Sequence, residues 1–513
     1  MQSETIRFLS RAETFGVSGV RRIETHVSIV FLAGQRAYKL KKAVRFPYLD
    51  FSTPELRRAA CEAEVAINRR TAPGMYRGVV PVSRDDSGGL RLGGEGEAVD
   101  WLVEMARFEQ DDLFDSLARR GGLDRRLMEE TAEVIAEFHR GARKRMESGG
   151  ADAMAAIIDN NAACFGQHGG DALGRATVES LNAASRRVLD RTGGMLDKRR
   201  SAGLVRHCHG DLHLGNIVLV EGRPTLFDAI EFNVLFAGID VLYDLAFLLM
   251  DLDHHGLGRL ASIVLNRYLD VTGDEDGLAA LPLFLSLRAA VRAHVKAATG
   301  AGPGDPDRAA GLRAEAGRYL EAALRYLSPP PPRLVAVGGL SGSGKSRLAR
   351  ELASMLGARP GARVARSDIL RKRLMGVPAT TRLGAEGYTE SMTEKTYETL
   401  FDVVGKALES GHSAIADAVF ARPGQRRAIA RVAERAGVSF QGLWLEAPRR
   451  ILEQRVRERT LNPSDATPEV IREQLGYDLG PMEWERVDSS GERQRTVETA
   501  VGLLGPRMLD GTL

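Results

Sequence analysis

One octapeptide constrains what this chain can fold into more than any other feature. It reads Gly339-Leu340-Ser341-Gly342-Ser343-Gly344-Lys345-Ser346 and fits G-x-x-x-x-G-K-[ST]. The apolar stretch 334–337 before it predicts a strand, and residues 346–356 predict a helix. Glycines let such a loop point its backbone N–H groups at phosphate oxygens, and the helix N-terminus adds a favourable partial charge. We therefore expect all eight residues to form a nucleotide-binding loop rather than a chance Gly-rich turn. In it, Lys345 would neutralise the β- and γ-phosphates, and Ser346 would reach Mg²⁺.

Two acids further along the chain follow predicted strands. Asp368 comes after the strand 363–366, and the C-terminal ends of strands in open α/β sheets border the crevice where substrates bind. Its carboxylate could orient or deprotonate an acceptor hydroxyl or help to hold Mg²⁺, with capping of the next helix as the structural alternative. Asp417 ends the apolar strand 413–416. This is the Walker-B arrangement, in which a carboxylate holds Mg²⁺ directly or through water.

Basic residues then precede a loop of turn-forming residues. Arg455 and Arg459 come before Asn-Pro-Ser-Asp-Ala at 462–466. Arginines on a mobile flap can close over a transferring phosphate and exclude water, although a solvated helix face is the alternative for such residues. The strands predicted in this part of the chain alternate with helices, which predicts a parallel sheet with helices on both faces.

A second group of polar residues lies in the first part of the chain. The run His209-Gly210-Asp211-Leu212-His213-Leu214-Gly215-Asn216 places Asp211 and Asn216 on one tight loop, and Asp228 ends the apolar stretch 224–227. A loop acid, an amide oxygen and a second acid can converge on a hydroxyl group and on Mg²⁺. We expect Asp211 to accept the hydroxyl proton, and Asn216 and Asp228 to hold the metal.

Four consecutive prolines at 329–332 divide the chain. Proline has no N–H to give to a helix or a central strand, so the run predicts an extended linker. Before it, a hairpin and a Ser/Thr-capped helix start predict a β-rich lobe over 1–105, and helical spacing predicts an α-rich lobe over 106–328. After it, 333–513 predicts a single α/β domain. The Gly-rich segment 85–96 predicts a mobile loop.

The region 333–513 resembles the small-molecule and nucleoside-monophosphate kinase branch of the P-loop proteins, which includes gluconate-kinase-like and zeta-toxin-like members. The motifs GLSGSGKS, RSDILRKRL, IADA and RERTLNPSDAT carry this resemblance. It implies an α/β P-loop kinase domain in which Arg455 and Arg459 are lid arginines.

The first part of the chain resembles aminoglycoside-phosphotransferase-like kinases, relatives of the protein-kinase fold. The loop with Asp211, Asn216 and the following Asp228 carries this resemblance. It implies a two-lobed α+β protein-kinase-like domain in which residues 101–105 form the hinge, with backbone groups near Glu104 and Met105 that contact adenine. The whole chain resembles bacterial bifunctional aminoglycoside phosphotransferase/ATP-binding proteins, which implies two kinase-like ATP sites.

The same resemblance implies roles for charged residues around the first site. Lys39 would pair the α- and β-phosphates, and Glu64 would be its ion-pair partner. Lys41 lies on the same strand face and is the competing lysine, and Glu62 is the competing acid. Ordinary surface charges are the alternative for the pair. Asp240 and Asp244 would be structural acids that buttress the catalytic loop.

Composition argues against several other classes of protein. Lys and Arg number 71 against 68 Asp and Glu, so the chain lacks the basic excess typical of proteins that bind nucleic acid or anionic membranes. The three cysteines are far apart, which argues against a disulfide scaffold or a zinc site. The start of the sequence does not resemble a secretion signal, and no apolar run approaches the ~20 residues of a membrane span. We expect a cytoplasmic protein.

The main hypothesis is an ATP-dependent phosphotransferase, bifunctional, that moves the γ-phosphoryl group of Mg-ATP to a hydroxyl of a small molecule. ATP and Mg²⁺ would be its cofactors and hydroxylated small molecules its partners. In one alternative, only the P-loop half is active and the first half is a ligand- or nucleotide-sensing pseudokinase. In another, the P-loop half is a zeta-toxin-like kinase of nucleotide sugars or nucleic acids, although the charge balance makes nucleic acid the weaker partner.

Overall fold

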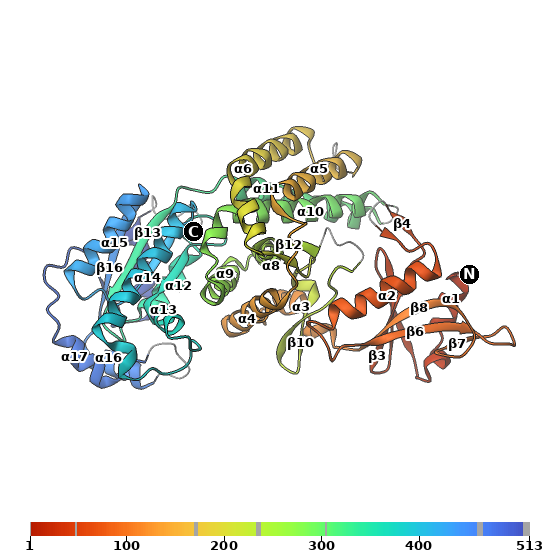
Figure 1. Ribbon diagram of the computed structural model, residues 1–513, viewed down its shortest axis with the longest axis horizontal. Coiled ribbons are helices and arrows are strands. Elements are labelled where there is room, and N and C mark those ends of the chain that lie inside the picture. The colour runs from red at the N-terminus through yellow and green to blue at the C-terminus, as the bar shows by residue number, and fades with distance from the viewer. Residues whose placement is uncertain are drawn as a thin grey trace. The chain divides into compact units, whose positions relative to one another are not determined.

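The structure is a computed structural model and describes residues 2–46, 49–168, 173–231, 237–302, 305–458 and 465–505. Two compact units make up the chain, and Figure 1 shows the elements of each. The first unit contains Met1–Met154 and Gly193–Asp251, and the second contains Ala155–Thr192 and Leu252–Leu513. The second unit therefore includes helices that precede the four prolines.

The first unit is built on an antiparallel sheet with the strand order β1-β2-β3-β8-β6-β7. Its strands are β1 (Val20–Glu24), β2 (Ser28–Ala33), β3 (Arg36–Lys41), β6 (Tyr76–Arg84), β7 (Leu90–Leu92) and β8 (Glu97–Ala106). β2 and β3 form the expected hairpin, and Gly34 has a φ of 57° in its turn, a conformation that favours glycine. The expectation of a loop over 85–96 is corrected in part, because β7 lies within this segment and pairs with β6.

Helix α2 (Pro54–Asn68) covers one face of this sheet. Thr53 caps the helix by accepting a hydrogen bond from the Leu56 N–H, and proline stands in its first turn. Because successive strand side chains point to opposite faces, Lys39 and Lys41 of β3 share the face that α2 covers. Buried apolar residues between sheet and helix include Leu32, Ala37, Cys61, Val65, Val103 and Met105.

Helices and short strand pairs complete the first unit. They are α3 (Phe114–Arg119), α4 (Arg125–Gly141), β9 (Val205–His207) with β12 (Gly238–Asp240), β10 (Ile217–Val220) with β11 (Arg223–Leu226), and α8 (Val241–His254). The polar loop with Asp211 lies between β9 and β10, above the buried helix α8. An antiparallel sheet with one covering helix, followed by a helical part that carries this loop, is the predicted two-lobed kinase-like fold.

The second unit contains a parallel sheet with the strand order β14-β15-β13-β16-β17. Its strands are β13 (Arg333–Gly339), β14 (Arg363–Arg366), β15 (Ala414–Asp417), β16 (Ser439–Glu446) and β17 (Glu485–Asp488). The helices between and after them are α12 (Lys345–Ala353), α13 (Ser367–Leu374), α14 (Glu390–Glu409), α15 (Pro423–Ala436), α16 (Arg449–Arg457), α17 (Pro468–Leu475) and α18 (Arg493–Leu504). The prediction of an α/β fold with a parallel sheet is confirmed.

This sheet is also preceded in the chain by the helices α5 (Gly150–His168), α6 (Arg175–Ser201), α9 (Gly258–Thr272), α10 (Leu281–Ala301) and α11 (Pro306–Tyr326). Within the described ranges, one stretch, Glu275–Ala301, is long and apolar enough to cross a membrane. This stretch is longer than the sequence led us to expect, but 72% of its apolar window is buried inside the protein. Helices that are apolar on most sides are also typical of protein cores.

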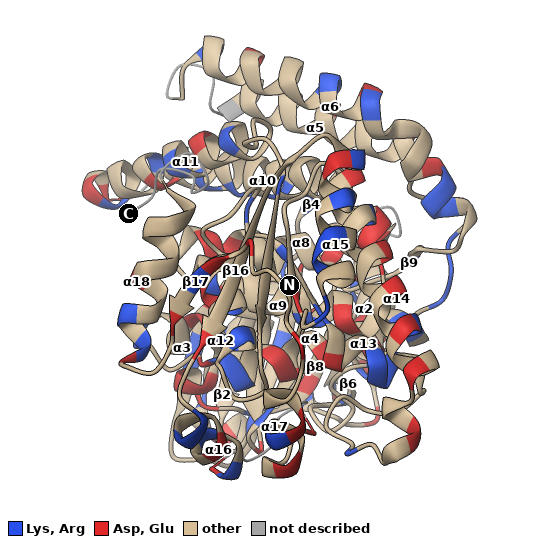
Figure 2. Ribbon diagram, turned by 90° about the vertical axis from the view of Figure 1, so that its left-hand side faces the viewer, with Lys and Arg blue, Asp and Glu red and all other residues tan. Residues whose placement is uncertain are grey.

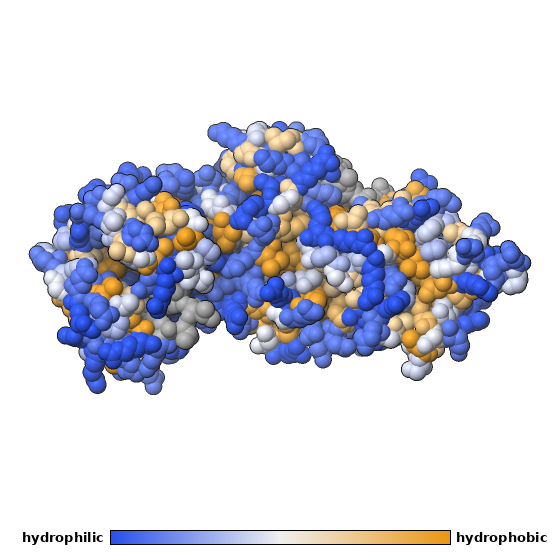
Figure 3. Space-filling view, turned by 60° about the horizontal axis from the view of Figure 1, so that its bottom comes forward, coloured by the Kyte–Doolittle hydropathy of each residue, from blue (hydrophilic) through white to orange (hydrophobic). Residues whose placement is uncertain are grey.

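Charges and apolar groups are mixed over the surfaces that the pictures show. In the view of Figure 2, basic and acidic residues are scattered among the other residues of the ribbon. On the face shown in Figure 3, apolar residues form patches broken up by hydrophilic ones. The charged residues drawn in Figure 2 therefore form no broad single-sign field in that view, of the kind that attracts polyanions.

Candidate active sites

The phosphate-loop residues lie between β13 and α12, as the sequence predicts. Gly339, Gly342 and Gly344 have φ values of 135°, 88° and 97°. A Cβ atom at Gly339 would lie 2.5 Å from the carbonyl oxygen of Leu445, and one at Gly342 would lie 2.7 Å from that of Leu452. The path of the loop therefore depends on glycine at both positions.

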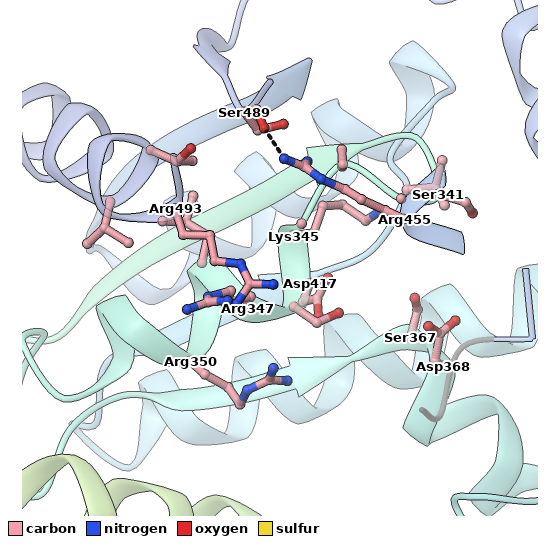
Figure 4. Close-up of a pocket in the computed structure, with 18 of the residues that line it drawn as sticks. Ser341, Lys345, Arg347, Arg350, Ser367, Asp368, Asp417, Arg455, Ser489 and Arg493 are labelled. Carbon is pink, nitrogen blue, oxygen red and sulfur yellow. Dashed lines mark hydrogen bonds between the residues drawn. The ribbon is translucent and has the colours of Figure 1, made fainter. Parts of the chain in front are cut away.

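One cavity of about 390 Å³ gathers most of the residues predicted for this site (Figure 4). The predicted residues in its lining are Ser341, Gly342, Ser343, Gly344, Lys345, Ser346, Asp368, Asp417 and Arg455. They come from the loop, α12, α13, β15 and α16, which are far apart in the sequence. Gly339 and Leu340 are not part of the lining, although the carbonyl oxygen of Leu340 accepts a hydrogen bond from Lys345 Nζ at 3.0 Å. Arg459 lies outside the described residues.

The two acids of this cavity differ in their surroundings. Asp417 ends β15 and is 3% exposed, and Arg366 Nε donates to its Oδ2 at 3.3 Å. Asp368 is the second residue of α13, whose N-cap is Arg366, so Asp368 is not the helix cap. Burial raises the pKa of the Asp368 carboxyl, Arg366 opposes this rise, and Asp417 adds to it. A carboxyl group with a raised pKa is a better proton acceptor near neutral pH.

Arginines that the sequence did not single out also line this cavity. Its cationic side chains are Lys345, Arg347, Arg350, Arg455 and Arg493, against the acids Asp368, Asp417 and Glu458. Arg455 donates from its guanidinium to the carbonyl oxygen of Ser489 at 2.7 Å, as Figure 4 shows. No motif marks Arg347, Arg350 or Arg493, because arginines on amphipathic helices are common and only the fold brings these three to one cavity.

In the first unit, two lysines of β3 bind one glutamate of α2. Lys39 Nζ lies 2.9 Å from Glu64 Oε1, and Lys41 Nζ lies 2.6 Å from Glu64 Oε2. Lys39 also reaches Asp228 Oδ1 at 2.6 Å, whereas Lys41 pairs with Glu231. The predicted Lys39–Glu64 pair therefore forms, and the competing lysine shares the same partner.

Burial separates these two lysines. The side chain of Lys39 is 13% exposed and that of Lys41 only 1%. Burial opposes the charge on both lysines, but the carboxylates around them outweigh it and raise both pKa values. The competing acid Glu62 is 55% exposed and pairs with Arg58 on the surface of α2. Lys39 is thus the more exposed of the two lysines, and it lies next to the half-exposed Asp228.

Asp211 and Asn216 are bonded to each other on their loop. Asn216 Nδ2 donates to the carbonyl oxygen of Asp211 at 2.9 Å and to its Oδ2 at 3.0 Å. The loop rests on Asp244 of α8, whose carboxylate accepts the backbone N–H groups of His209 at 3.0 Å and Gly210 at 2.8 Å. This is the buttressing role that the resemblance implied for Asp244.

Asp228 is tied to the same loop through the backbone. The Phe227 N–H donates to the carbonyl oxygen of Asn216 at 3.0 Å, and the ring of His209 bonds the carbonyl oxygen of Phe227 at 2.9 Å. Asp228 has a φ of 59°, which is uncommon for a residue with a side chain. Its N–H donates to the hydroxyl oxygen of Tyr76 at 3.1 Å. Backbone hydrogen bonds next to Asp228 therefore link it to the segment that carries Asn216.

A buried cluster beside this loop also has metal-binding side chains. Ligand-type atoms of His139, Cys208 and Asp244 lie within 4.8 Å of one another. However, the carboxylate of Asp244 already accepts a backbone N–H on each oxygen, and His139 Nε2 lies 3.1 Å from Oδ2. This cluster is a hydrogen-bonded support for the loop.

The predicted hinge residues lie in a strand of the antiparallel sheet. Glu104 and Met105 belong to β8, and both β3 and β6 pair with these two positions. Backbone groups inside a sheet are used by the neighbouring strands, and the side chain of Glu104 pairs with Arg36 at 3.0 Å. Contact of these backbone groups with adenine stays a prediction.

Comparisons with known proteins place this architecture in a family. Residues 334–477 match the protein family described as "AAA domain". The uncharacterized protein Rv2004c of Mycobacterium tuberculosis (strain ATCC 25618 / H37Rv) is 30% identical over 490 residues, which cover 93% of this chain and 94% of that protein. The chain belongs to the family of this protein. The uncharacterized protein Mb2027c of Mycobacterium bovis is another member, with the same identity and coverage.

Solved structures resemble separate parts of this family member. A sugar kinase from Janibacter sp. HTCC2649 is 21% identical, covers 35% of this chain and 99% of its own, and has a TM-score of 0.26. The aminoglycoside phosphotransferase APH(4)-Ia is 14% identical, covers 63% of this chain and 99% of its own, and has a TM-score of 0.37.

Proposed function

We propose that the second unit binds Mg-ATP at its phosphate loop and transfers the γ-phosphoryl group to a hydroxyl of a small molecule. One observation carries this proposal: a single cavity brings Lys345 and Ser346 of the loop together with two acids and Arg455 from separate elements. A loop that only bound phosphate would not require Asp368, an acid with a raised pKa, beside Asp417. The proposal includes a cytoplasmic location, where ATP is available as the phosphoryl donor.

The oxygen donors in the cavity suit Mg²⁺. The carboxylate of Asp417 is buried and lines the same cavity as the hydroxyl-bearing Ser346, and Mg²⁺ prefers one or two such ligands together with phosphate oxygens and water. When bound, Mg²⁺ would neutralise charge on the β- and γ-phosphates. Asp417 would exchange its hydrogen bond from Arg366 for this role.

In the transfer step, Asp368 would accept the proton of the acceptor hydroxyl as that oxygen forms a bond to the γ-phosphorus. The bond between the γ-phosphorus and the β,γ-bridging oxygen would break, and the bridging oxygen would leave with ADP. Lys345 and Arg455 would hold the phosphate charge that shifts during this step. The acceptor would therefore need a hydroxyl within hydrogen-bond reach of the Asp368 carboxylate.

This proposal is tested by phosphate transfer from γ-labelled ATP to pools of small metabolites. Lys345→Ala should abolish the labelled product of the second unit, because the loop loses its one charged contact to the transferring phosphate. Lys395→Ala, which alters an exposed lysine on α14, is the matched control and should leave transfer unchanged. Transfer that survives both Lys345→Ala and Asp211→Ala in full would show that neither site carries it.

We propose a second phosphotransferase site in the first unit. The ion pair between Lys39 and Glu64 supports it, together with the loop on which Asp211 and Asn216 bond to each other. Asp211 would accept the acceptor proton, while Asn216 and Asp228 offer oxygen ligands for Mg²⁺. If Asp211→Ala leaves every labelled product in place and Lys345→Ala removes them all, the first unit is a sensor rather than an enzyme.

The acceptor class separates a metabolic kinase from a zeta-toxin-like kinase. The near-neutral charge and the mixture of basic and acidic residues in Figure 2 favour small molecules over nucleic acid. The same labelled-ATP assay should therefore include hydroxylated metabolites, nucleotide sugars and RNA ends as separate acceptor pools. Labelling of RNA ends alone would assign the second unit to nucleic-acid chemistry instead.

A further inference from the structure

Helices that precede the four prolines cover an edge of the parallel sheet. In the strand order of this sheet, β14 is an outer strand with β15 on one side only. Outer strands leave backbone N–H and C=O groups without a strand partner. Helix α9 lies beside this part of the unit, near α12, as Figure 1 shows.

The side chain of Asn266 on α9 takes the place of a strand partner. Its Nδ2 donates to the carbonyl oxygen of Ala362 at 3.0 Å, and its Oδ1 accepts the N–H of Val364 at 2.7 Å. These are the backbone groups, two residues apart, that a further strand would pair with. One side-chain amide thus fixes the edge of β14 against α9.

A buried ion cluster holds the same strand from the same side. Arg363, the first residue of β14, is fully buried, and its Nη1 lies 2.7 Å from Asp270 Oδ1 on α9. Its Nη2 lies 3.0 Å from Oε1 of Glu275, which is itself 3% exposed and follows α9 in the short helix Glu275–Ala280. A fully buried guanidinium requires such carboxylates, because its charge cannot be solvated by water there.

The strand that is held in this way leads directly into the proposed active site. The last residue of β14, Arg366, donates to Asp417, and the next helix begins at Ser367 and carries Asp368. Lys345 and Asp417 belong to other elements, so a shift of β14 would move Asp368 relative to both of them. Positioning errors of about 1 Å in a phosphotransfer site can cost about 100-fold in rate.

We propose that Asn266, Asp270 and Glu275 are positioning residues for phosphoryl transfer in the second unit. They act through Arg363 and β14 on the carboxylate of Asp368, so the helical segment that precedes the prolines belongs functionally to the P-loop site. This inference rests on the proposed function of that site. It assigns a role in the reaction to residues that touch neither the loop nor the cavity lining.

The test uses the full-length chain with Glu275→Gln, which removes one carboxylate charge without changing the size of the side chain. Asp276→Asn, at the exposed neighbouring position, is the matched control. We expect Glu275→Gln to lower kcat about tenfold while the KM for ATP changes less than twofold, because Asp368 moves and the phosphate loop does not. Asn266→Ala provides a second variant and should lower kcat in the same way. Equal losses in kcat and in ATP binding, or an unchanged kcat, would overturn the proposal.

Hydrogen exchange in the nucleotide-free chain separates this inference from the proposed function. In Glu275→Gln, we expect faster exchange of the amides of residues 363–368 and unchanged exchange in β16, whereas Asp276→Asn should change neither. If the wild type transfers no phosphate, the proposed function fails, and a positioning role for this cluster fails with it. If the wild type is active and exchange over 363–368 is unchanged in Glu275→Gln, only the positioning role is refuted.

Discussion

Replacing Lys41 by Met should strongly destabilise the first unit, because Lys41 belongs to a buried group of ion pairs. Lys41 is 1% exposed and pairs with Glu64 and Glu231, which are 0% and 7% exposed. Breaking a buried ion pair costs about 3–5 kcal/mol, because the remaining charge is left without a partner. Glu64 keeps its bond to Lys39, so the loss falls mainly on Glu231. We expect about 3 kcal/mol, at the lower end of that range.

Native-state hydrogen exchange is the appropriate assay, because two compact units rarely unfold in a single two-state transition. A loss of about 3 kcal/mol should speed exchange of the most protected amides in β3 and α2 by about 100-fold. Lys42→Met is the matched control from the neighbouring position. Lys42 is 21% exposed and pairs with a half-exposed Glu24, so its removal should cost less than about 1 kcal/mol.

The dependence on pH and a double variant decide whether buried charge is the cause. Burial raises the pKa of Glu231, and Lys41 opposes this rise. Without Lys41, folded Glu231 holds its proton to higher pH than the unfolded chain does. The variant should therefore be closest to the wild type at low pH and lose stability as pH rises. Lys41→Met/Glu231→Gln should recover most of the loss at pH 8. If the double variant is no more stable than Lys41→Met, the reasoning from uncompensated charge is wrong.

Three further predictions concern the site residues. Lys39→Met should cost less stability than Lys41→Met, because Asp228 is 41% exposed, but it should remove ATP binding by the first unit in calorimetric titrations of a Lys345→Ala background. Asp368→Asn should abolish transfer by the second unit yet raise its unfolding temperature at pH 8. Burial raises the pKa of Asp368, so the contribution of this group to stability is lost as pH rises. The increase in unfolding temperature, measured by scanning calorimetry, should therefore vanish at low pH. Asp244→Ala should remove the carboxylate that accepts the backbone N–H groups of His209 and Gly210. This loss should cost about 3 kcal/mol or more and speed hydrogen exchange of the loop that carries Asp211.

Sequence reasoning worked best where chemistry and local structure coincide. The strand β13 is fully buried over Leu334 to Val337, as strands covered on both faces are, and the glycines that follow it leave little choice of conformation. Asp368 and Asp417 could be predicted because the ends of parallel strands meet at one edge of a sheet. A strand, a loop and an acid at fixed spacing are local signals, and one sequence is enough to detect them.

Signals that depend on tertiary packing could not be detected in this way. Lys39 and Lys41 lie on the same face of one predicted strand, and only the structure shows that one glutamate binds both lysines while Glu231 is the further partner of Lys41. The position of β8 between β3 and β6 in the antiparallel sheet also depends on long-range pairing. The pairing of Asn266 with the edge of β14 joins residues 96 and 98 positions apart, and no local pattern predicts it.

The two sites differ in how their cationic side chains are paired with acids, and this difference affects how each site could bind a nucleotide. In the first unit, Lys39 and Lys41 are paired with three carboxylates, so a phosphate that approaches Lys39 must replace Asp228 as its partner. Asp228 is also one of the two proposed metal ligands. Its carboxylate would therefore exchange its bond to Lys39 for a bond to Mg²⁺ when the nucleotide binds. In the second unit, five cationic side chains line the cavity against three acids, and phosphate adds negative charge to a site that has an excess of positive charge. Binding at the first site therefore requires a rearrangement of existing ion pairs, whereas binding at the second is favoured by the charge of the cavity itself.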